Sequence, residues 1–118
     1  MRAQINGKRG EDAACKFLKK NHYAILERNY RKRCGEIDII AQKDETIIFV
    51  EVKTRADISY GTPAEFVTYE KQQKIIKTAQ TYVVEQDLDA AYSFDVIEVF
   101  LTGNKVSRIN HIENAFYL

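Results

Sequence analysis

Two apolar segments separated by four polar residues place the tightest limit on how this chain can fold. EIDIIA at residues 36–41 and TIIFVEVKT at residues 46–54 are rich in Ile, Val and Phe, and the polar segment QKDE lies between them. Segments of this composition are typical of β-strands, and two strands joined by so short a connection form an antiparallel β-hairpin. The chain is therefore expected to build its sheet around this hairpin.

The predicted hairpin carries charged side chains at positions that aliphatic residues could fill. Glu51 and Lys53 share one face of their strand because side chains alternate with a period of two. A loop over residues 43–46 sets Asp38 opposite Glu51, whereas a loop centred on residues 43 and 44 sets Asp38 one diagonal step away. Both registers bring two carboxylates together. Such a pair shares a proton or holds a cation.

The remaining sequence predicts two helices and three further strands. In chain order we expect helix 10–21, strand 24–31, the hairpin strands, helix 62–86, strand 93–101, strand 105–112 and an apolar tail that docks on the body. The second helix opens on TPAE, a capping-box sequence at residues 62–65. The strand before this helix should run parallel to the strand after it. The predicted class is α/β, one domain over residues 1–118 with a mixed central sheet flanked by helices.

The first predicted helix carries an acid on its apolar side. Ala14, Cys15 and Leu18 form the stripe that would face the sheet, and Glu11 lies at the N-terminal end of that stripe. The helix dipole favours an acid near this end, but it does so on the exposed side too. If Glu11 reaches the hairpin, three acids face Lys53, and a divalent metal is the natural neutraliser. Oxygen ligands without neighbouring His or Cys favour Mg²⁺ or Mn²⁺.

Charge is distributed unevenly along the 118 residues. Residues 1–33 hold ten Lys or Arg and three acids, a net charge of +7, whereas residues 34–118 carry −6. This asymmetry indicates either a polyanion partner for the first segment or simply solvated helix faces. The longest aliphatic and aromatic run is the four-residue segment 47–50, against about 18 apolar residues for a membrane span. We therefore expect a cytoplasmic protein that does not enter a membrane.

An acid on the first helix, GEIDII on one strand and FVEVKTR on the next together resemble the PD-(D/E)XK nuclease superfamily, whose restriction-endonuclease-like core is αβββαβ. The sequence resembles the bacterial YraN family still more closely, and members of that family are often compared with Holliday-junction resolvases. The residues that carry this closer resemblance are Gly7, Gly10, Glu11, 28–31, 35–41, 49–55, Gly61, Pro63, Phe94, Asp95 and 114–116. Ser93 stands where the family pattern would place a basic residue.

The resemblance implies a metal-dependent nuclease acting on DNA. It implies that Asp38 and Glu51 bind Mg²⁺ or Mn²⁺ with the Val52 carbonyl, and that Glu11 contacts the ion directly or through water. Lys53 would hold or deprotonate the attacking water and stabilise the charged transition state. Glu36 either reaches Glu51 or lies at the solvated entrance of its strand.

Cationic side chains near these positions form a predicted contact surface for phosphates. They are Lys8, Arg9, Arg28, Arg31, Lys32, Arg33, Arg55, Lys71 and Lys74. Such groups position a nucleic-acid backbone without reading bases, which favours recognition of shape, such as branched or flapped DNA, and by analogy a homodimer. Two alternatives remain: a nucleic-acid-binding protein that does not cut or needs a partner, and an interaction domain whose acids form only an ion-pair network.

Overall fold

The computed structural model describes residues 2–56 and 67–117. Its elements follow one another in the expected order, αβββαβ with a fifth strand. They are α1 (Arg2–Lys20), β1 (Ala24–Lys32), β2 (Gly35–Lys43), β3 (Thr46–Ala56), α2 (Tyr69–Glu85), β4 (Ala91–Thr102) and β5 (Lys105–Phe116). No helix in these two stretches combines the length and the apolar character that crossing a membrane requires.

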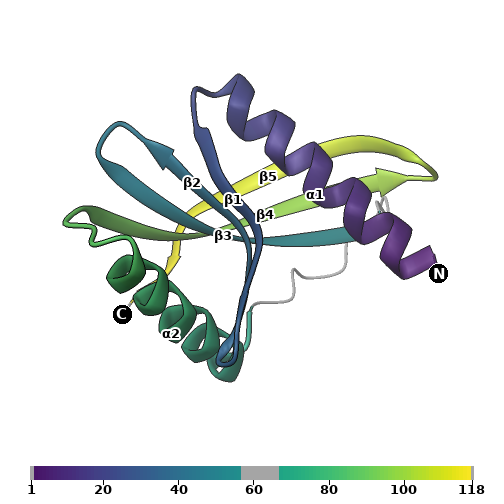
Figure 1. Cartoon of the computed structure of the whole chain (residues 1–118). Helices are drawn as coiled ribbons and strands as arrows, with labels where there is room; N and C mark the ends of the chain where they lie inside the picture. The colour runs from purple at the N-terminus through teal and green to yellow at the C-terminus, as the bar shows by residue number, and fades with distance from the viewer. Residues whose placement is uncertain (1, 57–66, 118) are drawn as a thin grey trace.

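The five strands form one mixed sheet in the order β1-β2-β3-β4-β5. Strands β3 and β4 pair in parallel, as the predicted crossover through α2 requires, and the other neighbours pair antiparallel. The two helices cover opposite faces of the sheet (Figure 1). The mixed α/β class predicted from the sequence is confirmed.

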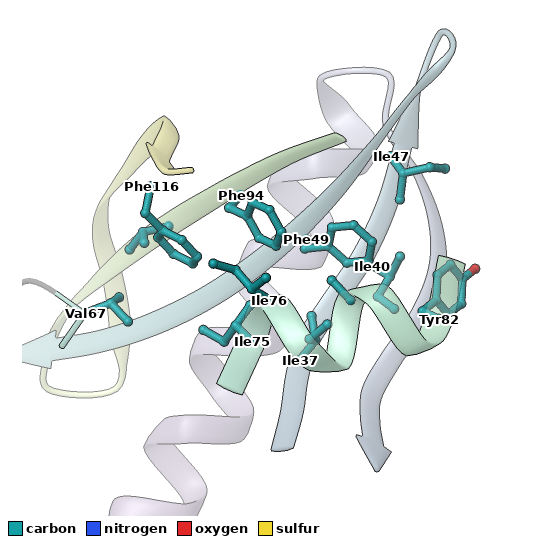
Figure 2. Close-up of a cluster of buried hydrophobic side chains, with 12 residues drawn as sticks. Ile37, Ile40, Ile47, Phe49, Val67, Ile75, Ile76, Tyr82, Phe94 and Phe116 are labelled. Atoms are coloured by element: carbon teal, nitrogen blue, oxygen red, sulfur yellow. The ribbon is translucent and has the colours of Figure 1, made fainter. Parts of the chain in front are cut away.

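Strand β3 is central and buried on both faces, which explains its continuous apolar run. Ile48 and Val50 join the core beneath α1, whereas Ile47 and Phe49 join the core beneath α2. Figure 2 shows the α2-side cluster, in which Phe49 and Phe94 stack with their ring centroids 5.5 Å apart. Phe116 of β5 packs on Phe94 in turn, so the apolar tail docks on the body as predicted.

The hairpin adopts the first of the two registers considered above. Pairing of β2 with β3 runs from Lys43↔Thr46 to Ile39↔Val50 and ends there, although both strands continue. Ile37 joins the α2-side core while Ile39 joins the α1-side core, and residues two apart in a regular strand would share a face. Strand β2 therefore twists at Asp38 and separates from β3, and we call this separation the fork.

The two helices begin at residues that the sequence did not predict. Helix α1 starts at Arg2 instead of Gly10, because the polar residues before Gly10 are good helix formers although they lack apolar periodicity. The capping-box segment 62–65 lies outside the described residues. Helix α2 starts at Tyr69, where the Thr68 side chain accepts a hydrogen bond from the Lys71 N–H, so the predicted start before residue 66 is wrong.

Candidate metal and active site

The fork between β2 and β3 opens into a cavity of about 500 Å³. Its lining comes from α1, β2, β3, the end of β4 and the β4–β5 turn, and consists of Gly7, Glu11, Asp38, Glu51, Val52, Thr54, Arg55, Ala56, Leu101 and Gly103. The cavity lies toward the C-terminal end of β3, the end at which open α/β sheets usually bind their ligands. Three of the predicted metal ligands therefore share one cavity with Val52.

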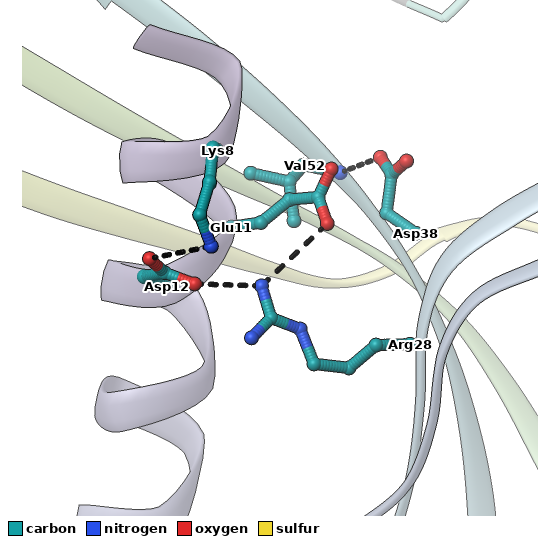
Figure 3. Close-up of polar contacts among 6 residues, drawn as sticks. All are labelled: Lys8, Glu11, Asp12, Arg28, Asp38 and Val52. Atoms are coloured by element: carbon teal, nitrogen blue, oxygen red, sulfur yellow. Dashed lines mark hydrogen bonds and ion pairs between the residues drawn. The ribbon is translucent and has the colours of Figure 1, made fainter. Parts of the chain in front are cut away.

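At the fork, the Asp38 side chain replaces the backbone hydrogen-bond partner that Val52 would have if β2 and β3 stayed paired. The Val52 N–H donates a hydrogen bond to Asp38 Oδ2 over 2.8 Å (Figure 3). Burial is the main cause that raises the pKa of Asp38 to about 7, the charges of Glu51 and Glu11 add to it, and the Val52 N–H and Lys71 oppose it. Near neutral pH this carboxyl group is therefore half protonated, and a cation bound beside it would displace the proton.

Glu51 is nearly inaccessible, with 6% of its surface exposed. Lys71 reaches it from α2, and its Nζ lies 2.9 Å from Glu51 Oε1. Burial acts to lower the pKa of the Lys71 ammonium, but its hydrogen bond to Glu51 and the negative charges of Glu51 and Asp38 outweigh burial and raise the pKa. Lys71 is thus a stable cation that neutralises one carboxylate of the cavity.

Glu11 reaches the cavity because α1 approaches β3 closely at the preceding residue. A Cβ atom at Gly10 would lie 1.9 Å from Thr54 Oγ1, so only glycine fits there. Figure 3 shows the Glu11 side chain extending from α1 toward Val52. Its Oε1 lies 3.7 Å from Arg28 Nη2, which is held by Asp12 at 2.8 Å. Glu11 faces the sheet, as its place on the apolar stripe predicts.

The three carboxylates share the cavity, but each has a donor of its own beside it. Glu11 has Arg28, Asp38 has the Val52 N–H, and Glu51 has Lys71. Among the described residues, the three carboxylates are not a group whose ligand atoms all lie within 4.8 Å of one another. The donor set consists of carboxylate and carbonyl oxygens, the ligand type that hard divalent cations prefer.

Asp95, His111 and Glu113 do form a group of ligand atoms within 4.8 Å of one another, away from the fork. Asp95 is 1% exposed and accepts hydrogen bonds from the Asn114 N–H at 3.1 Å, from the Ser93 hydroxyl group and from His111 Nε2 at 2.7 Å. These bonds lie at the register shift in the pairing of β4 with β5. The group therefore closes a β-bulge, and the Ser93 hydroxyl takes part in it through Asp95 and Asn114.

Proteins of similar sequence place the chain in a family. Residues 10–99 match the uncharacterised protein family UPF0102. The chain belongs to this family.

Several UPF0102 proteins are similar to the chain over nearly its whole length. One from Flavobacterium psychrophilum is 46% identical over 94% of this chain and 92% of its own length. Another from Geobacter metallireducens is 49% identical over 95% of this chain and 92% of its own length. A third from Persephonella marina is 46% identical over 97% of this chain and 95% of its own length. The stretch that matches the family contains Glu11, Asp38, Glu51 and Lys71.

Two other residues considered for the site, Lys53 and Glu36, do not line the cavity of this UPF0102 chain. Lys53 is partly exposed on β3, in register with Glu98 of β4, and it is not among the residues that line the cavity. Glu36 is exposed and its Oε2 lies 2.8 Å from Arg31 Nε. Of the two positions considered for Glu36, the structure therefore shows the solvated strand entrance.

Most cations of the predicted phosphate-contact surface are paired with partners inside the UPF0102 chain. The pairs are Lys8–Asp12, Arg9–Asn104, Arg28–Asp12, Arg31–Glu36, Lys32–Glu85, Arg55–Glu98 and Lys71–Glu51. Arg33 and Lys74 are exposed. The ion pairs between exposed side chains are weak and are screened by salt. The Arg55–Glu98 pair is largely buried, with side chains 20% and 4% exposed.

Sequence reasoning assigned Lys71 to phosphate contacts and missed its contact with Glu51. It also missed the pairing of His111 with Asp95. The sequence did carry one signal for the second pair, since Asp95, like Glu98, interrupts a segment whose other residues are mostly apolar. A buried acid of this kind needs hydrogen-bond donors.

Proposed function

We propose that this chain is a metal-dependent nuclease of the PD-(D/E)XK type, related to the YraN family, which hydrolyses phosphodiester bonds in DNA with Mg²⁺ or Mn²⁺. The observation that carries the proposal is the convergence of Glu11, Asp38 and Glu51, from three separate elements, on one cavity at the fork. The raised pKa of Asp38, about 7, supports it, because an acid with so raised a pKa in a cleft is a candidate functional group.

The proposed ligands fit a divalent ion in type and charge. Asp38, Glu51 and Glu11 offer carboxylate oxygens, and the Val52 carbonyl would complete the protein's share. Of the three acids, one is already balanced by Lys71, which leaves charge for a divalent ion to neutralise. When bound, the ion would polarise the phosphoryl oxygen and lower the pKa of an attacking water molecule.

The chain's own residues prepare the site before any ion binds. The Val52 N–H fixes the orientation of the Asp38 carboxylate, and close packing of Gly10 on Thr54 seats Glu11 over the end of β3. Lys53 and Lys71 supply positive charge on the α2 side of β3 for a phosphate or a charged transition state. The cations of α1 and β1 would position the nucleic-acid backbone, with branched or flapped DNA as the favoured substrate and a homodimer as the favoured assembly.

The test combines metal binding with cleavage. Calorimetric titration of Mn²⁺ into the wild-type chain should show a site that Asp38→Asn weakens at least tenfold, while Asp89→Asn, an exposed control, leaves it unchanged. Cleavage of labelled branched DNA should require Mg²⁺ or Mn²⁺ and should fall at least a hundredfold in Asp38→Asn. Equal Mn²⁺ binding by wild type and Asp38→Asn would refute a metal site at the fork.

A second candidate function is binding of branched DNA without cutting it. The position of Lys53 favours this alternative, because the residue expected to assist the attacking water does not line the cavity. Under this alternative, Lys53→Ala and the wild type would bind a DNA junction equally and neither would cleave it. Under the nuclease proposal, Lys53→Ala would bind the junction but cleave it at least tenfold more slowly.

A further inference from the structure

Lys71 is the one side chain from α2 that the structure brings to the carboxylates of the fork. Its Nζ lies 2.9 Å from Glu51 Oε1, and 45% of its side chain is exposed whereas only 7% of the Glu51 side chain is. The buried partner is therefore held in place by its surroundings. The exposed partner is a long, flexible chain that can leave without disturbing the core.

The local helix gives no reason for a lysine at this position. Lys71 is the third residue of α2, and a cation in the first turn of a helix is opposed by the positive end of the helix dipole. The cap does not need its side chain either, because the Thr68 hydroxyl binds the backbone N–H of Lys71. The ammonium group is thus positioned by its contact with Glu51 and not by helix formation.

A divalent ion and this ammonium group compete for the same carboxylate. Because the two oxygens of one carboxylate are close together, an ion coordinated by Glu51 would lie within a few ångströms of the Lys71 ammonium group, whose Nζ is 2.9 Å from Oε1. Two cations that close together in a partly buried site repel each other strongly. Lys71 binds Glu51, and the Val52 N–H binds Asp38. These separate contacts agree with the finding that, among the described residues, the ligand atoms of the three carboxylates do not all lie within 4.8 Å of one another.

We propose that Lys71 is a displaceable counter-ion: its ammonium group balances Glu51 in the metal-free chain, leaves when the divalent ion binds, and then contacts a non-bridging oxygen of the phosphodiester. This inference rests on the proposed function, since it requires that an ion binds at the fork. It adds a group from α2 to a site otherwise built from α1 and the hairpin. Lys71 thereby couples loading of the ion to binding of the substrate.

The same helix offers a matched control. Lys77 is exposed on α2 and is not one of the cations of the predicted phosphate-contact surface. Lys71→Met and Lys77→Met remove the same charge from α2 and keep a long side chain. A general effect of lowering the positive charge would appear in both variants, whereas loss of the counter-ion would appear in Lys71→Met alone.

The experiment titrates Mn²⁺ into the full chain without DNA and then measures cleavage of branched DNA at saturating Mn²⁺. We expect Lys71→Met to bind Mn²⁺ about fivefold more tightly than wild type, because the fraction of chains with a free Glu51 rises when an ion pair of modest strength is removed. Lys77→Met should bind Mn²⁺ as wild type does. The rate of cleavage by Lys71→Met should fall at least tenfold although the variant binds Mn²⁺ more tightly.

Each outcome separates this inference from the proposed function. If Lys71→Met binds Mn²⁺ as wild type does or more weakly, the displacement is refuted while the metal site stands. If it binds Mn²⁺ more tightly and cleaves normally, the contact with phosphate is refuted. If neither wild type nor Lys71→Met binds Mn²⁺, the proposed function falls and this inference falls with it. Far-ultraviolet circular dichroism confirms that both variants fold, and Lys71→Gln provides a second substitution.

Discussion

Replacing Asp38 with Asn should stabilise the metal-free chain at neutral pH. The substitution preserves the size of the side chain, and the amide oxygen can still accept the hydrogen bond that the Val52 N–H gives to Asp38 Oδ2 at 2.8 Å. It removes a charge that burial, Glu51 and Glu11 all disfavour. A cluster of acids that binds a cation destabilises the folded chain when the cation is absent. Removing one of these acids therefore increases the stability of the metal-free chain.

The pKa of Asp38 sets both the sign and the size of the effect. The folded chain keeps this proton up to pH about 7, whereas the unfolded chain releases it near the usual pKa of 3.8. The folded state therefore binds more protons between these values, and its free energy of unfolding falls as the pH rises from about 4 to about 7. A difference from 3.8 to about 7 corresponds to about 4 kcal/mol for an isolated group. Because relaxation of the surroundings offsets part of the cost of a buried charge, we expect Asp38→Asn to gain about 2 kcal/mol at pH 8.

Urea denaturation in the presence of a chelator measures this gain. Wild type and Asp38→Asn should have nearly equal free energies of unfolding at pH 4, and the variant should be about 2 kcal/mol more stable at pH 8. Asp89→Asn, an exposed control, should follow wild type at both values. If Asp38→Asn is no more stable than wild type at pH 8, the carboxylates of the fork do not repel one another. The proposal of a cation at the fork would then lose its energetic basis.

Three further substitutions test how the fold holds the site, each by urea denaturation of the purified variant. Gly10→Ala should cost about 2 kcal/mol, because the new methyl group would lie 1.9 Å from Thr54 Oγ1 and α1 must shift; unchanged stability would show that the helix adapts freely. Asp95→Ala should cost about 3 kcal/mol, since the buried N–H of Asn114 and its neighbours lose their acceptor, and a cost below 1 kcal/mol would contradict this role. Thr68→Ala should cost about 1 kcal/mol through loss of the α2 cap, and no loss would reassign the start of the helix.

The sequence predicted the sheet and limited the hairpin to two registers, because both follow from short-range alternation. The run from residues 47 to 50 is apolar at every position, and β3 is buried on both faces. The short polar connection limited the hairpin to two registers, and the one observed carries Asp38 toward Glu51. Side chains that follow a period of two can be placed from the sequence alone once the turn is located.

The helix starts could not be predicted in the same way. Capping patterns recur by chance, and TPAE at residues 62–65 and Thr68 both satisfy the rules for a cap. The residues before Gly10 carry no apolar periodicity, so nothing in the pattern extended α1 back to Arg2. Element boundaries depend on which of several weak local preferences the tertiary structure stabilises.

The contact of Lys71 with Glu51 shows where short-range reasoning ends. The segment between them, residues 52–70, includes the described start of α2, and the contact depends on where that helix begins and how it lies against the sheet. Displacement of the start by one residue would rotate Lys71 by about 100° around the helix axis and turn its ammonium group away from the fork. Asp38 and Glu51 were predictable because the hairpin fixes them, whereas the counter-ion of Glu51 depends on a helix start that the sequence placed incorrectly. When a charged site is built from two layers of a fold, the sequence therefore predicts only those of its residues that lie on one local element.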